Sequence, residues 1–182
     1  MKSKNESNKL AKECIVTALI ELMKVRDFHS ITITDLTKKA GVSRMAYYRN
    51  YTSKEDILNK FIDDVGADVH ERLADIYTDS DVYNYYYALL EQLGSYNDLA
   101  ITTYKAGLGE LILSQINKQM ALTFPSTGDA PVDHYRHLYL AGAFYNIFIE
   151  WLKNGQRESC AEIARLCCTL NREGISLPQK KG

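Results

Sequence analysis

The sequence has few helix-breaking residues and no long apolar run. Three prolines and ten glycines in 182 residues, with 46% hydrophobic residues, exclude a fibrous or intrinsically disordered chain. No segment reaches the roughly 18 uninterrupted apolar residues of a membrane span. The opening Lys-Ser-Lys-Asn-Glu is polar, unlike the apolar core of a secretory signal. We therefore expect a globular protein of the cytoplasm with no membrane partner.

Paired cysteines, metal sets and catalytic motifs are also missing. The four cysteines, Cys14, Cys160, Cys167 and Cys168, have no CxxC spacing, and we expect them to be reduced. Their apolar helical spacing favours buried structural roles, with a thiol sensor as the alternative. No Cys or carboxylate completes a metal set with the neighbouring histidines 134 and 137. Because phosphate-loop, GxSxG and HExxH motifs are absent, we expect no enzyme, no metal and no cofactor.

Charge is divided unequally along the chain. Residues 1–62 contain twelve Lys/Arg and seven Asp/Glu, a net charge of +5, whereas residues 63–182 have a net charge of −6. A basic segment joined to an acidic one is typical of a protein in which one module approaches phosphates, although chance is the alternative.

Apolar residues recur with helical spacing along the whole chain, which predicts an all-α fold. Nothing alternates with the period of two expected of strands. The pattern predicts a first helix within residues 8–28 and a long fourth helix reaching Leu73 past Gly66. Later helices are expected near residues 80–93, 98–120, 132–153 and 157–172, with a loop at 124–131.

Short helices with strong caps lie between residues 32 and 58. Thr32 and Asp35 have the spacing of a capping box, and Gly41 suits a left-handed helix end. Ser43 is placed to cap a third helix near residues 44–49, and the polar residues from Thr52 to Asp56 cap a fourth. Two short helices joined by a glycine turn form the arrangement that fits a helix into the major groove of DNA.

This region resembles the TetR/AcrR DNA-binding signature. The resemblance covers residues 33–58, ITDLTKKAGVSRMAYYRNYTSKEDIL, and is strongest at Ala-Gly-Val-Ser of the turn, at the Tyr47-Tyr48 pair and at Ser-Lys-Glu opening the fourth helix. The sequence departs from the usual pattern at Thr37, Met45 and Tyr51. The resemblance implies an N-terminal three-helix DNA-binding domain followed by a helical bundle for dimerisation and ligand binding.

The resemblance assigns DNA contacts to individual residues. Arg44, Met45 and Ala46 are expected to face base edges, whereas Thr34, Ser43, Tyr48 and Lys54 are expected to contact phosphates. Tyr47 is expected to pack inward. The alternative is a plain helical bundle in which the tyrosines are core residues and Lys54 is a solvated surface charge.

The remainder of the chain is expected to dimerise and to hold an effector. Residues 138–155 are apolar on nearly every face and are similar to the C-terminal domain of a low-molecular-weight, Gram-positive branch of the family. The predicted dimer contacts are Leu138, Gly142, Tyr145, Ile149, Ile163 and Cys167. The candidate ligand-lining residues, which are equally suited to a core, are Tyr86, Leu90, Tyr104, Leu108, Leu111, Tyr139, Phe144 and Phe148.

The predicted organisation is a helix-turn-helix domain at residues 1–56, a regulatory and dimerisation domain at 57–175 and a polar tail at 176–182. The resemblance implies a homodimeric repressor of a palindromic double-stranded DNA operator, with half-sites roughly 34 Å apart, that a small-molecule effector releases. Two alternatives stay open. One is a regulator of this type that activates or responds to a protein partner, and the other is a helical adaptor that does not bind DNA.

Overall fold

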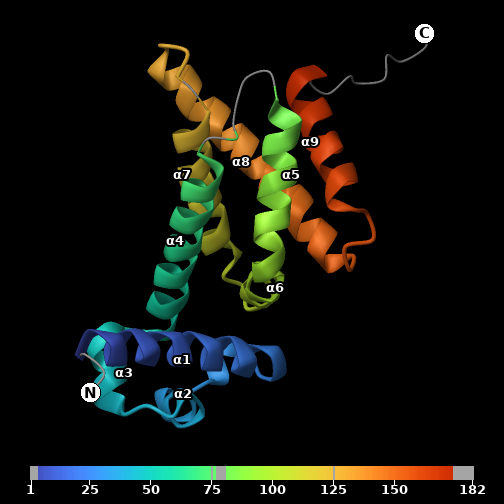
Figure 1. Ribbon diagram of the computed structural model, residues 1–182. Helices are drawn as coiled ribbons and strands as arrows, with labels where there is room; N and C mark the ends of the chain where they lie inside the picture. Colours follow the sequence, from blue (N-terminus) through green and yellow to red (C-terminus); the bar gives the residue numbers. More distant parts are fainter. Residues whose placement is uncertain (1–3, 75, 77–80, 125, 174–182) are drawn as a thin grey trace. The chain divides into compact units, whose positions relative to one another are not determined.

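The computed structural model describes residues 4–74, 76, 81–124 and 126–173, and Figure 1 shows them as a succession of helices. Every regular element in these residues is helical, so the all-α prediction is confirmed. The order is α1 (Lys4–Val25), η1 (Phe28–Ser30), α2 (Ile33–Ala40), α3 (Arg44–Asn50), α4 (Lys54–Leu73), α5 (Val82–Leu93), η2 (Gly94–Tyr96), α6 (Asn97–Lys105), α7 (Gly109–Thr123), α8 (Ala130–Lys153) and α9 (Cys160–Glu173).

The chain forms two compact units that do not match a simple division along the sequence. The first unit contains residues 1–65 and 98–115, and the second contains residues 66–97 and 116–182. Domain boundaries at 56 and 57 were expected from the sequence. Those positions lie in the first turn of α4, which continues unbroken from Lys54 to Leu73 and contains one boundary of the compact units, between Val65 and Gly66. The polar tail expected at 176–182 lies outside the described residues.

In the first unit, α1 packs against both α2 and α3, which also contact each other. The core of this unit, to which α4 also contributes, is apolar and fully buried. Its most completely buried side chains are Ile15, Leu19, Leu36, Tyr47, Ile57 and Leu58. Since α1 supplies the apolar face that both short helices need, α2 and α3 are held by tertiary packing more than by their own length.

In the second unit, α5 and α9 lie side by side and pack closely along their lengths (Figure 1). The Tyr86 ring lies 5.8 Å from the Phe144 ring of α8, which stacks on Phe148 at 5.9 Å. The Asn171 side-chain amide donates a hydrogen bond of 2.6 Å to the Tyr86 hydroxyl. Aromatic packing therefore joins α5, α8 and α9 into one core.

The prediction of one helix over residues 98–120 was wrong. Residues 98–120 are not a single helix, because α6 ends before Gly107 and α7 begins at Gly109. Gly107 has a φ of +76°, its N–H donates to the Tyr104 carbonyl, and the Leu108 N–H donates to the Thr103 carbonyl. These paired bonds are a Schellman helix end, which the left-handed glycine permits.

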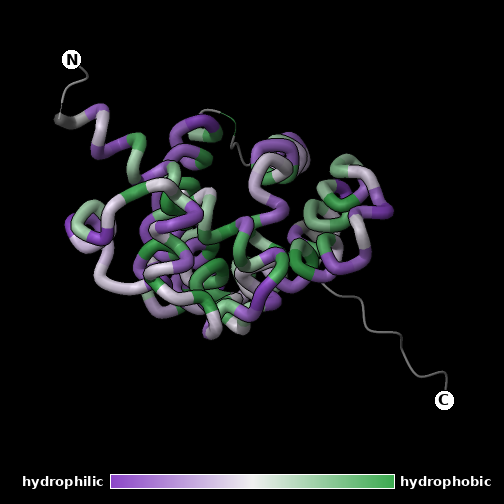
Figure 2. The backbone as a smooth tube through the Cα atoms, turned by 90° about the horizontal axis from the view of Figure 1, so that it is seen from below, coloured by the Kyte–Doolittle hydropathy of each residue, from purple (hydrophilic) through white to green (hydrophobic). Residues whose placement is uncertain are grey.

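The other expected helices are found with shifted ends. The first helix ends at Val25, and the connector after it forms the short η1 helix, which Asp27 caps. The helix expected from residue 132 begins at Ala130 with a proline in its first turn. Figure 2 shows polar and apolar residues alternating at short intervals along the described helices. Among those residues we find no helix with the length and hydropathy needed to cross a bilayer.

Candidate nucleic-acid interface

The N-terminus of α2 is fixed by the capping box that the sequence predicted. The Asp35 N–H donates to Thr32 Oγ1 at 3.1 Å, and the Thr32 N–H donates to Asp35 Oδ2 at 3.1 Å. Hydrogen bonds from the Thr32 side chain and backbone lower the pKa of Asp35, so the carboxylate stays charged at neutral pH. Arg26 adds an ion pair to Asp35 at 3.2 Å. The first helix of the motif therefore begins at a defined residue.

The turn between α2 and α3 depends on Gly41. Its φ is +66°, its N–H donates to the Lys38 carbonyl, and the Val42 N–H donates to the Thr37 carbonyl. This Schellman end terminates α2, and only residues 41–43 join it to α3. Ser43 then starts α3, since the Ala46 N–H donates to Ser43 Oγ at 3.1 Å. Both sequence-predicted caps of the turn are confirmed.

Two opposite faces of α3 carry different side chains. Tyr47 is fully buried and Tyr51, which follows the helix, is 5% exposed, so the predicted inward packing of Tyr47 is confirmed. Met45 is 74% exposed and Tyr48 is 57% exposed, although both are large and apolar enough to be buried. Arg44 is also exposed. Exposed bulky side chains beside a free cation are suited to contact a partner.

Thr34 of α2 is exposed, whereas Thr37, where the family usually has alanine, is buried. The Thr37 hydroxyl donates to the Ile33 carbonyl at 2.9 Å, so the additional polar group is satisfied within its own helix. Ala46 is partly buried, because the face it shares with Asn50 approaches α1. The departure at Thr37 is therefore accommodated locally.

Lys54 is partly buried, and its ammonium makes contacts within its own unit. Its Nζ donates to the Phe28 carbonyl at 2.7 Å and to the Ile31 carbonyl at 2.6 Å. The same ammonium lies 4.6 Å from the centre of the Phe28 ring. Lys54 thus caps the end of η1 and joins the start of α4 to the segment between α1 and α2.

Several cations of the first unit have no acidic partner among the described residues. These are Lys9 and Lys12 of α1, Lys38 of α2, and Arg44 and Arg49 of α3, and all of them are exposed. By contrast, Lys24 pairs with Asp98, Lys39 with Glu21 and Lys60 with Asp56. Unpaired cations on α2 and α3 are free to meet phosphates.

Sequence reasoning missed Lys38 and Arg49, although a signal was present. Residues 36–54 contain five Lys/Arg and no Asp/Glu. A stretch with cations and no acid cannot neutralise itself through local ion pairs. That count points to both residues without any structural information.

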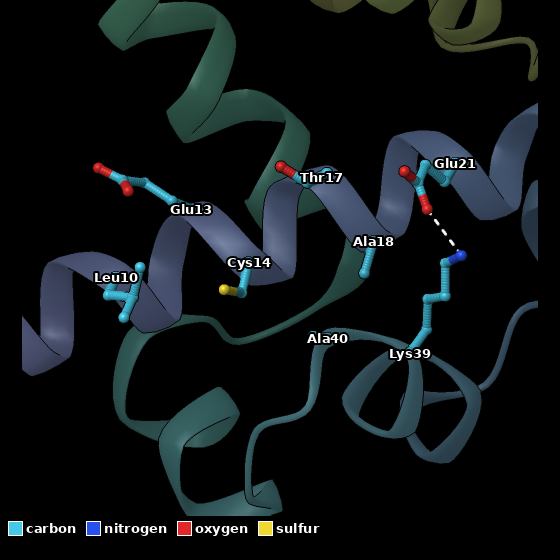
Figure 3. Close-up of a pocket in the computed structure, with 8 residues that line it drawn as sticks. All are labelled: Leu10, Glu13, Cys14, Thr17, Ala18, Glu21, Lys39 and Ala40. Atoms are coloured by element: carbon cyan, nitrogen blue, oxygen red, sulfur yellow. Dashed lines mark ion pairs between the residues drawn. The ribbon is translucent and has the colours of Figure 1, made fainter.

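A shallow hollow of about 310 Å³ lies between α1 and α2 (Figure 3). Figure 3 shows the Glu21–Lys39 ion pair, with an N–O distance of 2.7 Å, at one end of it. The remaining lining residues are Leu10, Glu13, Cys14, Thr17, Ala18 and Ala40. None of these residues was among the ligand-lining residues expected from the sequence.

Comparison with known proteins identifies the motif. Residues 15–61 match the family described as bacterial regulatory proteins, tetR family. The HTH-type transcriptional regulator AlkX of Mycobacterium tuberculosis (strain ATCC 25618 / H37Rv) is 25% identical over 182 residues, which span 94% of this chain and 78% of AlkX. Residues 15–61 thus form a DNA-binding domain of the TetR family.

Two solved TetR structures share the fold. A TetR transcriptional regulator from Streptococcus agalactiae 2603V is 20% identical with a TM-score of 0.65, covering 92% of this chain and 96% of that one. FadR of Thermus thermophilus, a TetR-family repressor in complex with lauroyl-CoA, is 20% identical with a TM-score of 0.55, covering 94% of this chain and 98% of FadR. The chain is a DNA-binding transcription regulator whose helix-turn-helix is α2 and α3.

The residues expected to line a ligand site fall into both units of the chain. Tyr104, Leu108 and Leu111 belong to the first unit. The others belong to the second, where Tyr86, Leu90, Phe144 and Phe148 are buried core residues and Tyr139 is 59% exposed.

The residues expected at a dimer interface fall into an exposed group and a buried group. Leu138 is exposed, and Gly142 and Tyr145 are partly exposed, so a partner can reach all three. Ile149, Ile163 and Cys167 are buried within their own unit and offer little area to a second chain. Burial raises the pKa of the Cys167 thiol to about 12, which keeps it protonated at neutral pH.

Proposed function

We propose that this TetR-family chain is a homodimeric repressor of the cytoplasm that binds a palindromic operator and leaves it when a small molecule binds. The observation that carries the DNA-binding part is the exposed face of α3, where Arg44, Met45 and Tyr48 project while Tyr47 fills the core behind them. A recognition helix needs one face anchored in the core and another face whose exposed side chains can contact DNA.

The contacts divide between base edges and phosphates. Arg44 is placed to pair with guanine, and Met45 and Ala46 to meet a thymine methyl. Thr34, Ser43 and Tyr48 supply hydroxyl groups for phosphates, and Lys38 and Arg49 supply the charge. Lys54 contributes mainly by holding α4 and η1 together, because two of its three N–H groups are already used.

Dimerisation is supported by an exposed apolar stripe on α8. Val132, Tyr135, Leu138 and Tyr139 recur at intervals of three and four residues, and each is at least 40% exposed. Tyrosines in such a stripe are typical of protein interfaces. We therefore place the dimer surface on this part of α8, together with the Gly142 and Tyr145 expected from the sequence and the exposed Leu166 of α9.

Effector binding is supported by buried polar groups in α6 and α7. Thr103 Oγ1 and Gln115 Oε1 are buried without a protein partner. Such groups destabilise a protein by about 1–3 kcal/mol unless another molecule satisfies them. We propose a mainly apolar effector with a polar group. Because FadR was solved with lauroyl-CoA, acyl thioesters are the first class to test.

The function is tested by fluorescence anisotropy on DNA flanking the protein's own gene, at two salt concentrations. Wild type should bind this DNA more tightly than random DNA, and less tightly at the higher salt. Tyr48→Phe removes only the exposed hydroxyl and should weaken binding about five- to tenfold, through loss of one phosphate hydrogen bond. Tyr87→Phe, a matched change at an exposed tyrosine of α5, should bind like wild type. Absence of DNA binding even at low salt would support the adaptor alternative.

A further inference from the structure

The C-terminal end of the recognition helix is tied to α1 by a pair of asparagines. Asn8 Nδ2 donates to Asn50 Oδ1 at 3.1 Å, and Asn50 Nδ2 donates to Asn8 Oδ1 at 3.0 Å. Asn8 lies in the second turn of α1 and Asn50 is the last residue of α3. Both side chains are partly buried. The two reciprocal bonds fix direction as well as distance, because both amide groups are planar.

Asn50 is also held from its other sides. Its Nδ2 donates to the Ala46 carbonyl at 2.8 Å, and its own carbonyl accepts a bond of 3.0 Å from Lys60 Nζ of α4. Lys60 is in turn paired with Asp56 at 2.9 Å. The end of α3 is therefore connected to α1 through Asn8 and to α4 through Lys60.

A helix as short as α3 depends on such anchors. It has seven residues, too few to be stable or to keep its own direction in isolation. Arg44 lies about 9 Å along the helix from Asn50, at about 1.5 Å per residue. A tilt of about 10° at the Asn50 end would move Arg44 by roughly 1.5 Å, more than a directed hydrogen bond to a base tolerates.

We propose that Asn8 and Asn50 are positioning residues for base recognition, which set the angle of α3 in the major groove without touching DNA. This inference rests on the proposed DNA-binding function. Contacts to phosphates hold the protein on a duplex of any sequence. Discrimination between sequences depends on where the side chains of α3 reach the base edges. Loss of the pair therefore lowers specific binding and leaves non-specific binding unchanged.

The test compares Asn8→Ala with Asn59→Ala, a matched change at an exposed asparagine of α4. Affinity for the operator and for random DNA is measured by anisotropy over a range of salt concentrations. Asn8→Ala should lower operator affinity about tenfold, with random-DNA affinity within about twofold of wild type and the slope of log K against log salt unchanged. Asn59→Ala should match wild type. Asn8→Ala combined with Asn50→Ala should bind no more weakly than the poorer single variant, because both remove the same contact.

Two results would overturn the proposal. A parallel loss of random-DNA affinity would make Asn8 a direct phosphate contact, with the salt slope still unchanged because its amide carries no charge. If Asn8→Ala keeps the wild-type ratio of operator affinity to random-DNA affinity, the asparagine pair has a purely structural role. Hydrogen exchange of the α3 amides provides a readout independent of DNA, and exchange in Asn8→Ala should be faster at Tyr47–Asn50 while α2 is unaffected. If wild type discriminates no sequence, the proposed function fails, and unchanged exchange at α3 would separately refute the positioning role.

Discussion

Lys54 is the residue at which a functional and a structural role compete. The family resemblance predicts that Lys54 contacts a DNA phosphate. In the structure its ammonium donates to the carbonyls of Phe28 and Ile31 and lies over the Phe28 ring. An ammonium group has three N–H donors, so only one is available for DNA. Lys38 is exposed and has no such partners. The two lysines should therefore respond differently to the same substitution.

We expect Lys54→Met to lower the free energy of unfolding by about 1–3 kcal/mol, because two charge-assisted hydrogen bonds are lost. Its effect on the salt dependence of DNA binding should be small. Lys38→Met should leave stability within about 0.5 kcal/mol of wild type and reduce the salt slope by about 0.9. Urea unfolding and anisotropy titrations measure these two quantities. A reduced slope with unchanged stability for Lys54→Met would restore Lys54 as a phosphate contact.

Tyr47 carries a hydroxyl group that its surroundings do not satisfy. The oxygen is buried without a hydrogen-bond partner, and desolvation, aided by Tyr48, Glu55 and Asp56, raises the pKa of Tyr47 from 10.0 to about 12. The folded state thus favours the neutral form. The stability this supplies is complete below pH 10 and is lost as the pH rises toward 12, since the unfolded chain then releases the proton more readily.

Tyr47→Phe should therefore keep the fold and increase the free energy of unfolding at pH 7 by about 1 kcal/mol, because an unsatisfied buried hydroxyl is removed. Its stability should also fall less steeply than that of wild type between pH 10 and 12. Urea unfolding at a series of pH values measures both effects. Tyr48→Phe is the control, since its hydroxyl is exposed. A destabilised Tyr47→Phe would mean that the hydroxyl has a partner in solution.

Among the secondary-structure elements, the helix ends that depend on neighbouring residues were predicted correctly. The capping box at Thr32, the left-handed Gly41 and the Ser43 cap each depend on residues within four positions of one another, and all were predicted from sequence. The break at Gly107 is also local, but glycine is tolerated inside helices, so its apolar neighbours suggested a continuous helix.

Contacts between distant residues were not predictable in this way. Asn8 and Asn50 are 42 residues apart, and Lys54 lies 26 residues from Phe28. An asparagine at the start of a helix has no spacing pattern that identifies its partner. The buried positions of Ile149, Ile163 and Cys167 were missed for the same reason, since an apolar helix face does not say whether its own chain or a second chain covers it.

The stripe on α8 yields a prediction for assembly. Tyr139→Glu places a charge in the centre of the proposed interface and should raise the dimer dissociation constant at least about 100-fold, since buried aromatic residues dominate such interfaces. Val25→Glu, at an exposed apolar position of α1, should leave the dimer intact. Sedimentation velocity across a concentration series distinguishes the two. A Tyr139→Glu chain that remains dimeric would move the interface away from this face.

At the scale of the molecule, the two compact units share α4 and α7. The unit boundaries fall between Val65 and Gly66 and between Gln115 and Ile116. Both helices are continuous across these boundaries. A shift of α7 at the buried Gln115 would therefore be transmitted along the helix backbone to both units. The basic charge of residues 1–62 lies in the first unit, where the helix-turn-helix is found.

Gln115→Leu tests the effector proposal on the whole protein. Removing a buried amide whose oxygen has no hydrogen-bond partner should raise the melting temperature of the free protein. It should also weaken the release of operator DNA by an active acyl thioester, with operator affinity unchanged in its absence. Gln92→Leu is the control, because Gln92 interacts at the surface with Arg72. Undiminished release from Gln115→Leu would show that the effector does not use this amide.

Selection of binding sites from a random DNA pool tests whether α3 reads a DNA sequence as part of a paired protein. Wild type and the distant control Arg157→Ala should enrich the same inverted repeat, with half-sites about 10 base pairs apart. Arg44→Ala should lose the preference at one base pair of each half-site, a discrimination of about 1–3 kcal/mol. Failure to enrich any sequence, or equal enrichment of the same repeat by Arg44→Ala, would show that Arg44 of α3 does not read the operator.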